Sequence, residues 1–372
     1  MQSGTYLKLN KALRGLSEQD ALALGARAAL RALPIALVEG ADGCDMYLLA
    51  AFRGAIVHAA ACSEPSPAAR RAARSAALWM VELGHIGSKM ERPARQAFAA
   101  ANGAARAGSF FFDRVDPDKG VANAATDALR ACANVWPEAE TVIVRDVAAI
   151  DVLDGAVALF QQPLFPDNWE DLTAPERKTL DRYLAAEPEK WAFWHAWYNG
   201  YVNGQPLEWD LQREVALLPE HVWLESPVSV ARHIERIKAR MATVVAVRDA
   251  EDELRSAART RHGIGGNFPP EPIDLPSPSV TDALLAARAP LREISAQVEM
   301  FEPELTVIQS ALAQLKEFLN MGFRWVAGKA DLAVDTTIKW GIPAVGGGYL
   351  ALNPDKIEAV ILAAEKWLLL AP

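Results

Sequence analysis

The sequence lacks the short motifs that usually mark a catalytic or cofactor site. Its 372 residues contain no GxxxxGK[ST], GxSxG or CxxC pattern, and the six histidines form no HExxH pair. The histidines and cysteines form no C-x₂₋₄-C or H-x₃₋₅-H pair of the kind that binds zinc. The motifs therefore predict no catalytic residue, no metal and no cofactor, and an enzyme is the least favoured class of function.

Cysteine is scarce, and the start of the chain lacks the pattern of a secretory signal. An odd number of widely spaced thiols, Cys44, Cys62 and Cys132, favours free cysteines in a reducing compartment over a disulfide framework. The first twenty residues show no basic segment followed by an apolar one. We therefore expect a cytoplasmic protein, which can also lie at the periphery of the inner membrane.

Basic residues are outnumbered by acidic ones. With 38 Lys and Arg against 47 Asp and Glu, the formal net charge is −9, which argues against a nucleic-acid partner. Apolar residues make up 51% of the chain and charged residues 23%, as in ordinary soluble proteins. The length is sufficient for two domains.

The sequence also has little strand-like alternation and no convincing internal repeat, whereas helical periodicity recurs throughout. We therefore predict a mainly α fold, in which a multi-helix bundle precedes a Pro/Gly-rich linker and a smaller helical part. Residues 45–62 are apolar almost all round, which is typical of a helix buried inside a bundle. The main helices are expected at 17–33, where Pro34 should end the first one, and at 45–62, 68–85, 93–107, 122–135, 140–160, 207–218, 227–261, 281–300, 302–319, 322–340 and 354–370.

The predicted linker covers residues 261–280, between an N-terminal domain of residues 1–260 and a C-terminal region of residues 281–372. Its first part, residues 261–279, holds three glycines and five prolines, which exclude a continuous helix or a central strand. The glycines at 263–266 could also cradle a phosphate, but that motif requires a preceding strand and a following helix. The candidate hinge residues are Gly263, Gly265, Gly266, Pro269 and Pro270.

An aromatic cluster is the most prominent candidate binding region. Its residues share one face of a predicted helix, and such a wall can stack a base, a sugar or an apolar ligand. Aromatic side chains at helical spacing are more often part of a core, which is the favoured interpretation. The candidate ligand-binding residues are Trp191, Trp194, His195, Trp197 and Tyr198.

Three carboxylates, Asp146, Asp151 and Asp154, interrupt an otherwise apolar segment. A buried pair of carboxylates can perform acid/base chemistry when the two pKa values are pushed apart. Solvated positions on an amphipathic helix explain the same pattern more simply, because structural carboxylates far outnumber catalytic ones. The surface interpretation is therefore favoured for these residues.

The C-terminal stretch at 333–370 is unusually apolar. Its uncharged run at 340–354 is shorter than a spanning helix and contains proline and glycine, so a constitutive transmembrane helix is not predicted. Two alternatives follow: a helical hairpin that enters a bilayer on activation, or a soluble hairpin that packs on a partner or on a second copy. The candidate membrane or assembly residues are Trp340, Ile342, Pro343, Tyr349 and Trp367.

The segment 191–198, WAFWHAWY, and the linker around His262, Asn267, Pro269, Pro270 and Glu271 resemble a set of uncharacterised bacterial proteins. Those proteins share a helical N-terminal half, a tryptophan-rich segment, a His-Gly/Asn-rich-Asn-x-Pro-Pro-Glu linker and a short hydrophobic tail. The resemblance covers roughly the last half of the chain. It implies an architecture and transfers no activity, cofactor or site residue.

Taken together, these features lead to three hypotheses about function. The first is a non-enzymatic helical effector, toxin-like or of a defence type, whose apolar C-terminal hairpin engages a membrane or drives self-assembly. The second is a soluble scaffold or protein-interaction module that forms homo- or hetero-oligomers. The third, from a different class, is an enzyme that uses the tryptophan-rich region as its pocket. A protein partner or a second copy is expected under the first two.

Overall fold

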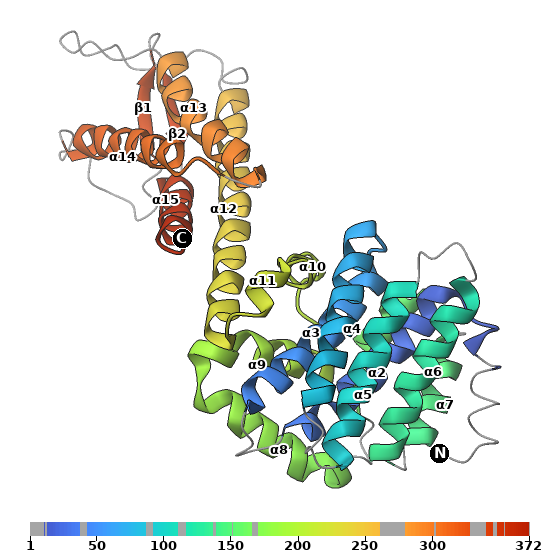
Figure 1. The fold of residues 1–372 in the computed structure, drawn as a ribbon. Helices are drawn as coiled ribbons and strands as arrows, with labels where there is room; N and C mark the ends of the chain where they lie inside the picture. Colours follow the sequence, from blue (N-terminus) through green and yellow to red (C-terminus); the bar gives the residue numbers. More distant parts are fainter. Residues whose placement is uncertain are drawn as a thin grey trace. The chain divides into compact units, whose positions relative to one another are not determined.

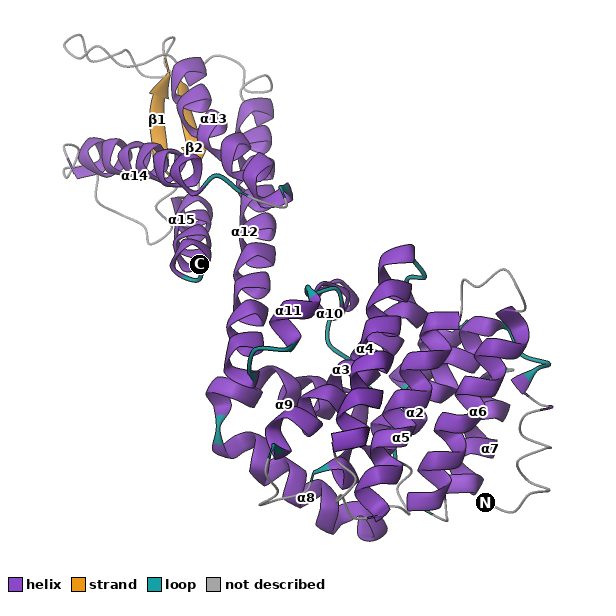
Figure 2. Ribbon diagram, viewed as in Figure 1, coloured by secondary structure: helices purple, strands orange, loops and turns teal. Residues whose placement is uncertain are grey.

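The chain folds as a mainly α protein, as predicted (Figures 1 and 2). The computed structural model describes residues 11, 13–37, 43–86, 92–110, 117–136, 139–150, 152–165, 170–260, 280–300, 303–327, 340–344, 348–352 and 354–371. The chain divides into two compact units, Met1–Ile234 and Glu235–Pro372, which we call unit 1 and unit 2. Each unit is described by itself.

The described residues of unit 1 form a bundle of α-helices with one 3₁₀ segment. Helix α5 lies at its centre and packs against α2, α3, α4 and α6, while α8 packs on α9 and α10 packs on α3. The elements of unit 1 are α2 (Glu18–Ala36), α3 (Cys44–Ser63), α4 (Pro67–Ile86), α5 (Arg92–Phe110), α6 (Pro117–Val135), α7 (Ala139–Ile150), η2 (Ala156–Gln161), α8 (Glu170–Ala186), α9 (Pro188–Val202), α10 (Trp209–Ala216), α11 (Glu220–Trp223) and the start of α12 (Pro227–Thr260).

Helix α3 is buried along most of its length, as its all-round apolar sequence predicts. By length and hydropathy, it is also the one helix among the described residues that could cross a membrane. Its most apolar window is 83% buried inside the protein, which is the behaviour of a core helix. The hydropathy of α3 therefore carries little weight as evidence for a membrane span.

Small residues allow the helices of unit 1 to approach closely. A Cβ atom added at Gly103 of α5 would lie 2.8 Å from the backbone nitrogen of Ala128 in α6. One added at Gly54 of α3 would lie 2.9 Å from the Met80 sulfur and 3.1 Å from the Ala101 carbonyl oxygen. Larger side chains at these positions would push the helices apart, so the alanine- and glycine-rich composition sets the geometry of the bundle.

Helix α2 is capped at its start and extends beyond the proline that was predicted to end it. Ser17 caps α2, because its hydroxyl accepts a hydrogen bond from the Asp20 amide at 3.1 Å. The prediction that Pro34 ends this helix is wrong, since α2 continues to Ala36. Proline removes one backbone hydrogen bond, and burial of the surrounding residues offsets that loss in the last turn.

His58 lies fully buried in the middle of this bundle. Its Nε2 atom donates a hydrogen bond to the Leu22 carbonyl oxygen at 2.5 Å, and Gly25 and Gly108 leave room for its ring. Burial lowers the pKa of His58 to about 4, although the carbonyls of Leu22 and Ala104 act in the opposite direction. The folded state therefore requires a neutral imidazole.

This burial makes the stability of unit 1 depend on pH. The folded pKa of about 4 lies below the unfolded value of 6.5, so the stabilisation is complete above pH 6.5 and is lost as the pH falls towards 4. We expect the free energy of unfolding to fall by up to about 1.4 kcal/mol per pH unit from about pH 6.5 to about pH 5. Urea unfolding followed by hydrogen exchange of α2 and α3 measures this slope. His58→Gln should reduce it, whereas exposed His221→Gln should not; equal slopes would contradict this account.

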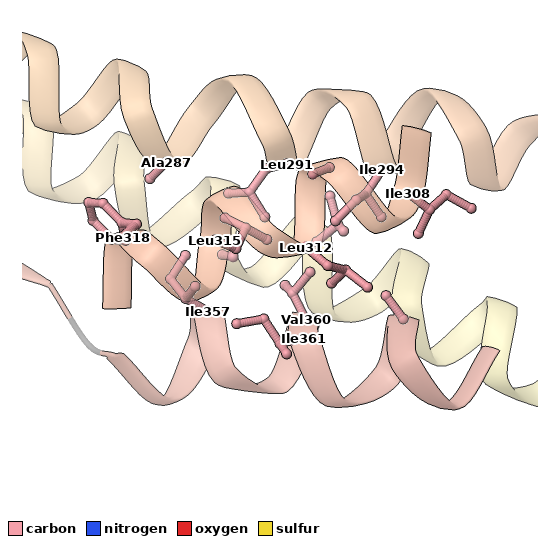
Figure 3. Close-up of a cluster of buried hydrophobic side chains, with 14 of the residues drawn as sticks. Ala287, Leu291, Ile294, Ile308, Leu312, Leu315, Phe318, Ile357, Val360 and Ile361 are labelled. Carbon is pink, nitrogen blue, oxygen red and sulfur yellow. The ribbon is translucent and has the colours of Figure 1, made fainter. Parts of the chain in front are cut away.

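Unit 2 is a smaller helical bundle with a two-stranded sheet. Apolar residues of α12, α13, α14 and α15 form one core, and Figure 3 shows side chains of α14 lying between those of α13 and α15. The elements of unit 2 are the remainder of α12, α13 (Val280–Glu299), α14 (Leu305–Ala327), β1 (Trp340–Ala344), β2 (Gly348–Leu352) and α15 (Pro354–Leu369).

Helix α12 contributes to both units, because the division falls between Ile234 and Glu235 inside it. Its residues Ala239, Val247, Ala250 and Leu254 belong to the core of unit 2. The division between the units therefore falls within α12, whereas the sequence analysis placed the domain boundary at the Pro/Gly segment. The predicted linker at 261–280, with all five candidate hinge residues, lies outside the described residues except for Val280 at the start of α13.

The C-terminal hairpin is made of strands. The prediction of a helical hairpin is wrong at this point, because β1 pairs with β2 in antiparallel register. Ile342 is opposite Leu350, and Pro343 is opposite Tyr349. Trp340, where the sequence predicted the end of a helix, is the first residue of β1. Proline costs about 3 kcal/mol and glycine about 1 kcal/mol inside a helix, but a short edge strand tolerates both.

The last helix, α15, is fastened into unit 2. Its apolar face, which includes Trp367, is buried in the shared core, so this candidate membrane residue lies inside the protein. Ion pairs flank that face: Lys356 Nζ lies 2.7 Å from Asp249 of α12, and Glu365 lies 2.5 Å from Lys316 of α14. Exposed ion pairs of this kind contribute little energy, so the apolar face supplies most of the attachment.

Candidate functional site

The candidate site is a groove on the surface of unit 1 with a volume of about 370 Å³, formed where α4, α5 and α6 meet. We call it the α4–α5–α6 groove. It combines an apolar wall with polar and charged groups, which is the general composition of binding sites. Its lining residues are Met80, Val81, Arg95, Phe98, Ala99, Asn102, Gly103, Arg106 and Asp127.

Helix α5 supplies most of the groove, and the spacing of its residues explains why. Arg95 and Arg106 are eleven residues apart, which is close to three full turns, so both extend from the same side of the helix. At about 1.5 Å of rise per residue, their Cα atoms are roughly 16 Å apart along the axis. Ala99 and Asn102 lie between them on the same face. The groove therefore carries a guanidinium group towards each end.

The apolar wall comes from α4 and from the buried edge of α5. Phe98 is almost fully buried and meets Tyr47 edge-on, with ring centroids 6.3 Å apart. Met80 is buried beside it, whereas Val81 is 47% exposed. The amide of Asn102 donates a hydrogen bond to the Ala77 carbonyl oxygen at 3.1 Å and ties α5 to α4. The wall is thus held by packed helices and ends in an apolar edge open to solvent.

One acidic residue completes the groove. The close contact of α5 and α6 at Gly103 brings Asp127 towards Arg106, whose Nη1 atom lies 3.8 Å from the Asp127 Oδ2 atom. Both side chains are nearly half exposed, at 47% and 44%, so water screens the pair and its contribution is small.

The aromatic cluster predicted from the sequence does come together, and it lies in the core. Trp191, Trp194 and Trp197 are fully buried, and Tyr198 is 3% exposed. Phe52 of α3 stacks on Trp194 with centroids 4.9 Å apart, and Trp197 meets Trp194 edge-on at 5.8 Å. These rings contact protein side chains in the manner of a core, which was the favoured interpretation.

Some polar atoms of the same cluster form hydrogen bonds, and others are buried without one. Gln212 of α10 accepts hydrogen bonds from the Trp197 indole at 2.7 Å and from the Tyr201 hydroxyl at 2.6 Å. Its own amide donates to the Leu207 carbonyl oxygen at 2.6 Å, so this glutamine fastens α10 to α9. The indole N–H groups of Trp191 and Trp194 are buried without a partner among the described residues, which costs about 1–3 kcal/mol each.

His195 is not buried with its aromatic neighbours. Its side chain is 31% exposed, and its Nε2 atom lies 2.5 Å from the Asp181 carboxylate of α8. This contact joins α8 and α9 at the surface. Across the described residues, no group of three or more His, Cys, Asp or Glu side chains is arranged to hold a metal ion.

Three charged residues are buried together elsewhere in unit 1. Asp146 of α7 lies 2.9 Å from Arg27 Nε and 2.6 Å from Arg31 Nη2, both on α2. Burial alone would raise the pKa of Asp146, but the two guanidinium groups and their hydrogen bonds hold it below its ordinary value. The favoured surface interpretation is therefore wrong for Asp146. Asp154 is exposed as this interpretation expects, but it lies between α7 and η2 and not on a helix, while Asp151 lies outside the described residues.

The role of this buried group is structural. Burial lowers the pKa of Arg27 to about 10, yet Arg27 stays charged at neutral pH and donates to the carbonyl oxygens of Leu159, Gln162 and Pro163. Arg31 donates to the Leu164 carbonyl oxygen at 2.9 Å. The two arginines thus tie the irregular segment after α7 to α2.

Arg53 is a further buried cation that the sequence analysis did not single out. Its guanidinium carbon lies 5.4 Å from the centroid of Trp79 and 5.1 Å from that of Trp223, and its Nη2 atom donates to Ser75. Burial lowers its pKa to about 10, although the negative charge of Glu220 opposes the shift. Arg53 joins α3, α4 and α11 through these contacts.

The residues of the α4–α5–α6 groove were also missed by the sequence analysis. The signal that could have found them is the spacing of Arg95 and Arg106 on an alanine-rich helix. Comparison of the chain with protein-family models, with curated proteins and with solved structures found no match. The resemblance to a set of bacterial proteins therefore stays a prediction, and the function is argued from the site.

Removal of Asp146 should strongly destabilise unit 1, because two buried arginines would then lack their counter-charge. We expect Asp146→Ala to lower the free energy of unfolding by about 3–5 kcal/mol. Asp154→Ala removes an exposed carboxylate of the following segment and should change it by less than about 0.5 kcal/mol. Urea unfolding of the full-length variants measures both values, and similar small effects for the two would show that the buried group contributes nothing.

Proposed function

We propose that this chain is a non-enzymatic helical protein-interaction module that receives a partner in the α4–α5–α6 groove. The observation that carries the proposal is the combination within one groove of the exposed apolar edge at Val81 with arginines at both ends of α5. Apolar grooves bordered by charge are a recurring means of binding helical segments. The proposal corresponds to the second hypothesis from the sequence.

The rigidity of the groove supports this function. Its walls are helices fixed by the contact of Gly103 with Ala128 and by the hydrogen bond from Asn102 to Ala77. A preformed groove loses little conformational entropy when a partner binds, so more of the contact energy is retained as affinity. The walls also run along α5 for about three turns, a length that suits a peptide segment better than a compact small molecule.

The ionisable groups of the groove favour binding over catalysis. They are Arg95, Arg106 and Asp127. Arginine does not exchange protons near neutral pH, and Asp127 is already engaged with Arg106, so the described lining residues offer no matched acid and base. The enzyme hypothesis relied on the tryptophan-rich region, whose rings are enclosed by the core.

Filling the groove should abolish partner binding. Ala99 is exposed on α5, and Ala99→Trp places a large ring in the groove without replacing a core residue. Ala148→Trp places the same ring on an exposed position of α7 and is the matched control. Peptides selected from a phage-displayed random library on the wild-type protein should lose about tenfold or more in affinity for Ala99→Trp only. Selected peptides that bind all three proteins equally would refute the groove as the binding site.

The membrane hypothesis is tested separately on the full-length protein. Because unit 2 encloses the apolar face of α15, we expect the protein to stay in the supernatant when it is sedimented with liposomes of anionic phospholipid. Co-sedimentation that is removed by Ile342→Glu in β1, but not by Ala148→Glu on α7, would contradict this expectation. That result would instead favour membrane contact through the C-terminal hairpin.

A further inference from the structure

Arg53, near the middle of α3, is a buried cation with an incomplete set of partners. Its side chain is 1% exposed, so the charge lies inside the bundle. Among the described residues, no Asp or Glu forms an ion pair with it. Its Nη2 atom donates a hydrogen bond to the Ser75 hydroxyl at 2.8 Å, whereas its Nε and Nη1 atoms are buried without an acceptor. Two of the three guanidinium nitrogens therefore lack a partner.

Arg27 shows what a buried guanidinium receives elsewhere in this chain. It forms an ion pair with Asp146 and donates to three backbone carbonyl oxygens. Arg53 has the rings of Trp79 and Trp223 within cation–π distance instead. Ring faces stabilise a cation but accept hydrogen bonds weakly, so the open N–H donors stay unmatched. A buried charge in this condition is unfavourable, and an acceptor from outside the chain would recover that free energy.

From this gap we infer that Arg53 binds a small oxyanion, through a carboxylate or a phosphate group. The oxygen atoms of both groups match the donors of a guanidinium and form charge-assisted hydrogen bonds with them. An oxyanion also brings the counter-charge that the bundle does not supply to Arg53. A water molecule would supply an acceptor without that charge, and the experiment below distinguishes the two.

The anion reaches Arg53 beside α11, the single helical turn that covers it. Only Val222 and Trp223 of α11 are buried, while Glu220 is exposed. The Trp223 indole donates to the Leu218 carbonyl oxygen of the same short segment at 3.2 Å, so its ring moves together with this turn. A shift of α11 therefore uncovers the guanidinium and leaves the long helices of the bundle in place.

Glu220 sets the strength of the site. Its negative charge acts on Arg53, because it opposes the lowering of the Arg53 pKa by burial. The carboxylate is exposed and forms no ion pair with the guanidinium among the described residues, so it leaves the open donors unmatched. The same charge repels an incoming anion. We therefore expect Glu220→Gln to strengthen binding about fivefold.

Anion-dependent stability of the full-length protein tests the inference. Melting temperatures are measured in rising concentrations of formate or of inorganic phosphate, against chloride at equal ionic strength. Phosphate also stabilises proteins non-specifically, so the decisive quantity is the difference from Arg53→Met, which keeps a long side chain without charge or donors. The wild-type melting temperature should rise with saturation, as expected for ligand binding to the folded state. Arg53→Met should lack the saturating part, and Glu220→Gln should reach half-saturation at about fivefold lower concentration.

A second measurement needs no stable Arg53→Met protein. The Arg53 Nε–H signal in the NMR spectrum, identified by its absence in Arg53→Lys, should shift during the same titrations with the same midpoint. A response to formate alone assigns a carboxylate, and a response to phosphate alone assigns a phosphate. An Nε–H signal unmoved by both anions would overturn the inference and leave water as the acceptor. Ala99→Trp should leave the anion response unchanged, so this site and the α4–α5–α6 groove stand or fall separately.

Discussion

The close approach of helices in unit 1 is the constraint on which the rest of that unit depends. Gly103 meets the backbone of α6, and Gly54 meets Met80 and the backbone of α5, at distances that leave no room for a larger side chain. This contact allows α5 to touch α2, α3, α4 and α6 at once. One face of α5 is buried in the bundle, and the face that carries Arg95 and Arg106 borders the groove.

Buried charges add a second constraint, since each has to be paired inside a core that small residues have made dense. Arg27 and Arg31 meet Asp146 and the carbonyl oxygens after α7, and Arg53 lies between two tryptophan rings. Buried ion pairs of this kind add little net stability relative to apolar residues, but they penalise any arrangement that leaves one partner alone. They therefore specify how α2, α3, α4, α7 and α11 fit together.

Local patterns predicted the elements that depend on local physics, and they failed where distant residues meet. The burial of α3 and the mainly α fold followed from helical periodicity. Asp146 is 119 residues from Arg27, and no spacing rule connects them. The strands at 340–352 were read as helical because short apolar runs do not distinguish helix from strand. The groove joins three helices, and its residues become neighbours only after α4, α5 and α6 pack.

The contrast between the aromatic cluster and the groove shows why burial decides between candidate sites. Tryptophans are conspicuous in the sequence, but the rings of Trp191, Trp194 and Trp197 are buried in contacts among themselves and with Phe52. A ligand could reach these rings only by displacing the helices that enclose them. The groove contains less distinctive residues, but its arginines and its apolar edge face solvent on a rigid support. Binding energy is available where surface is both exposed and preorganised, and in unit 1 that condition is met along α5.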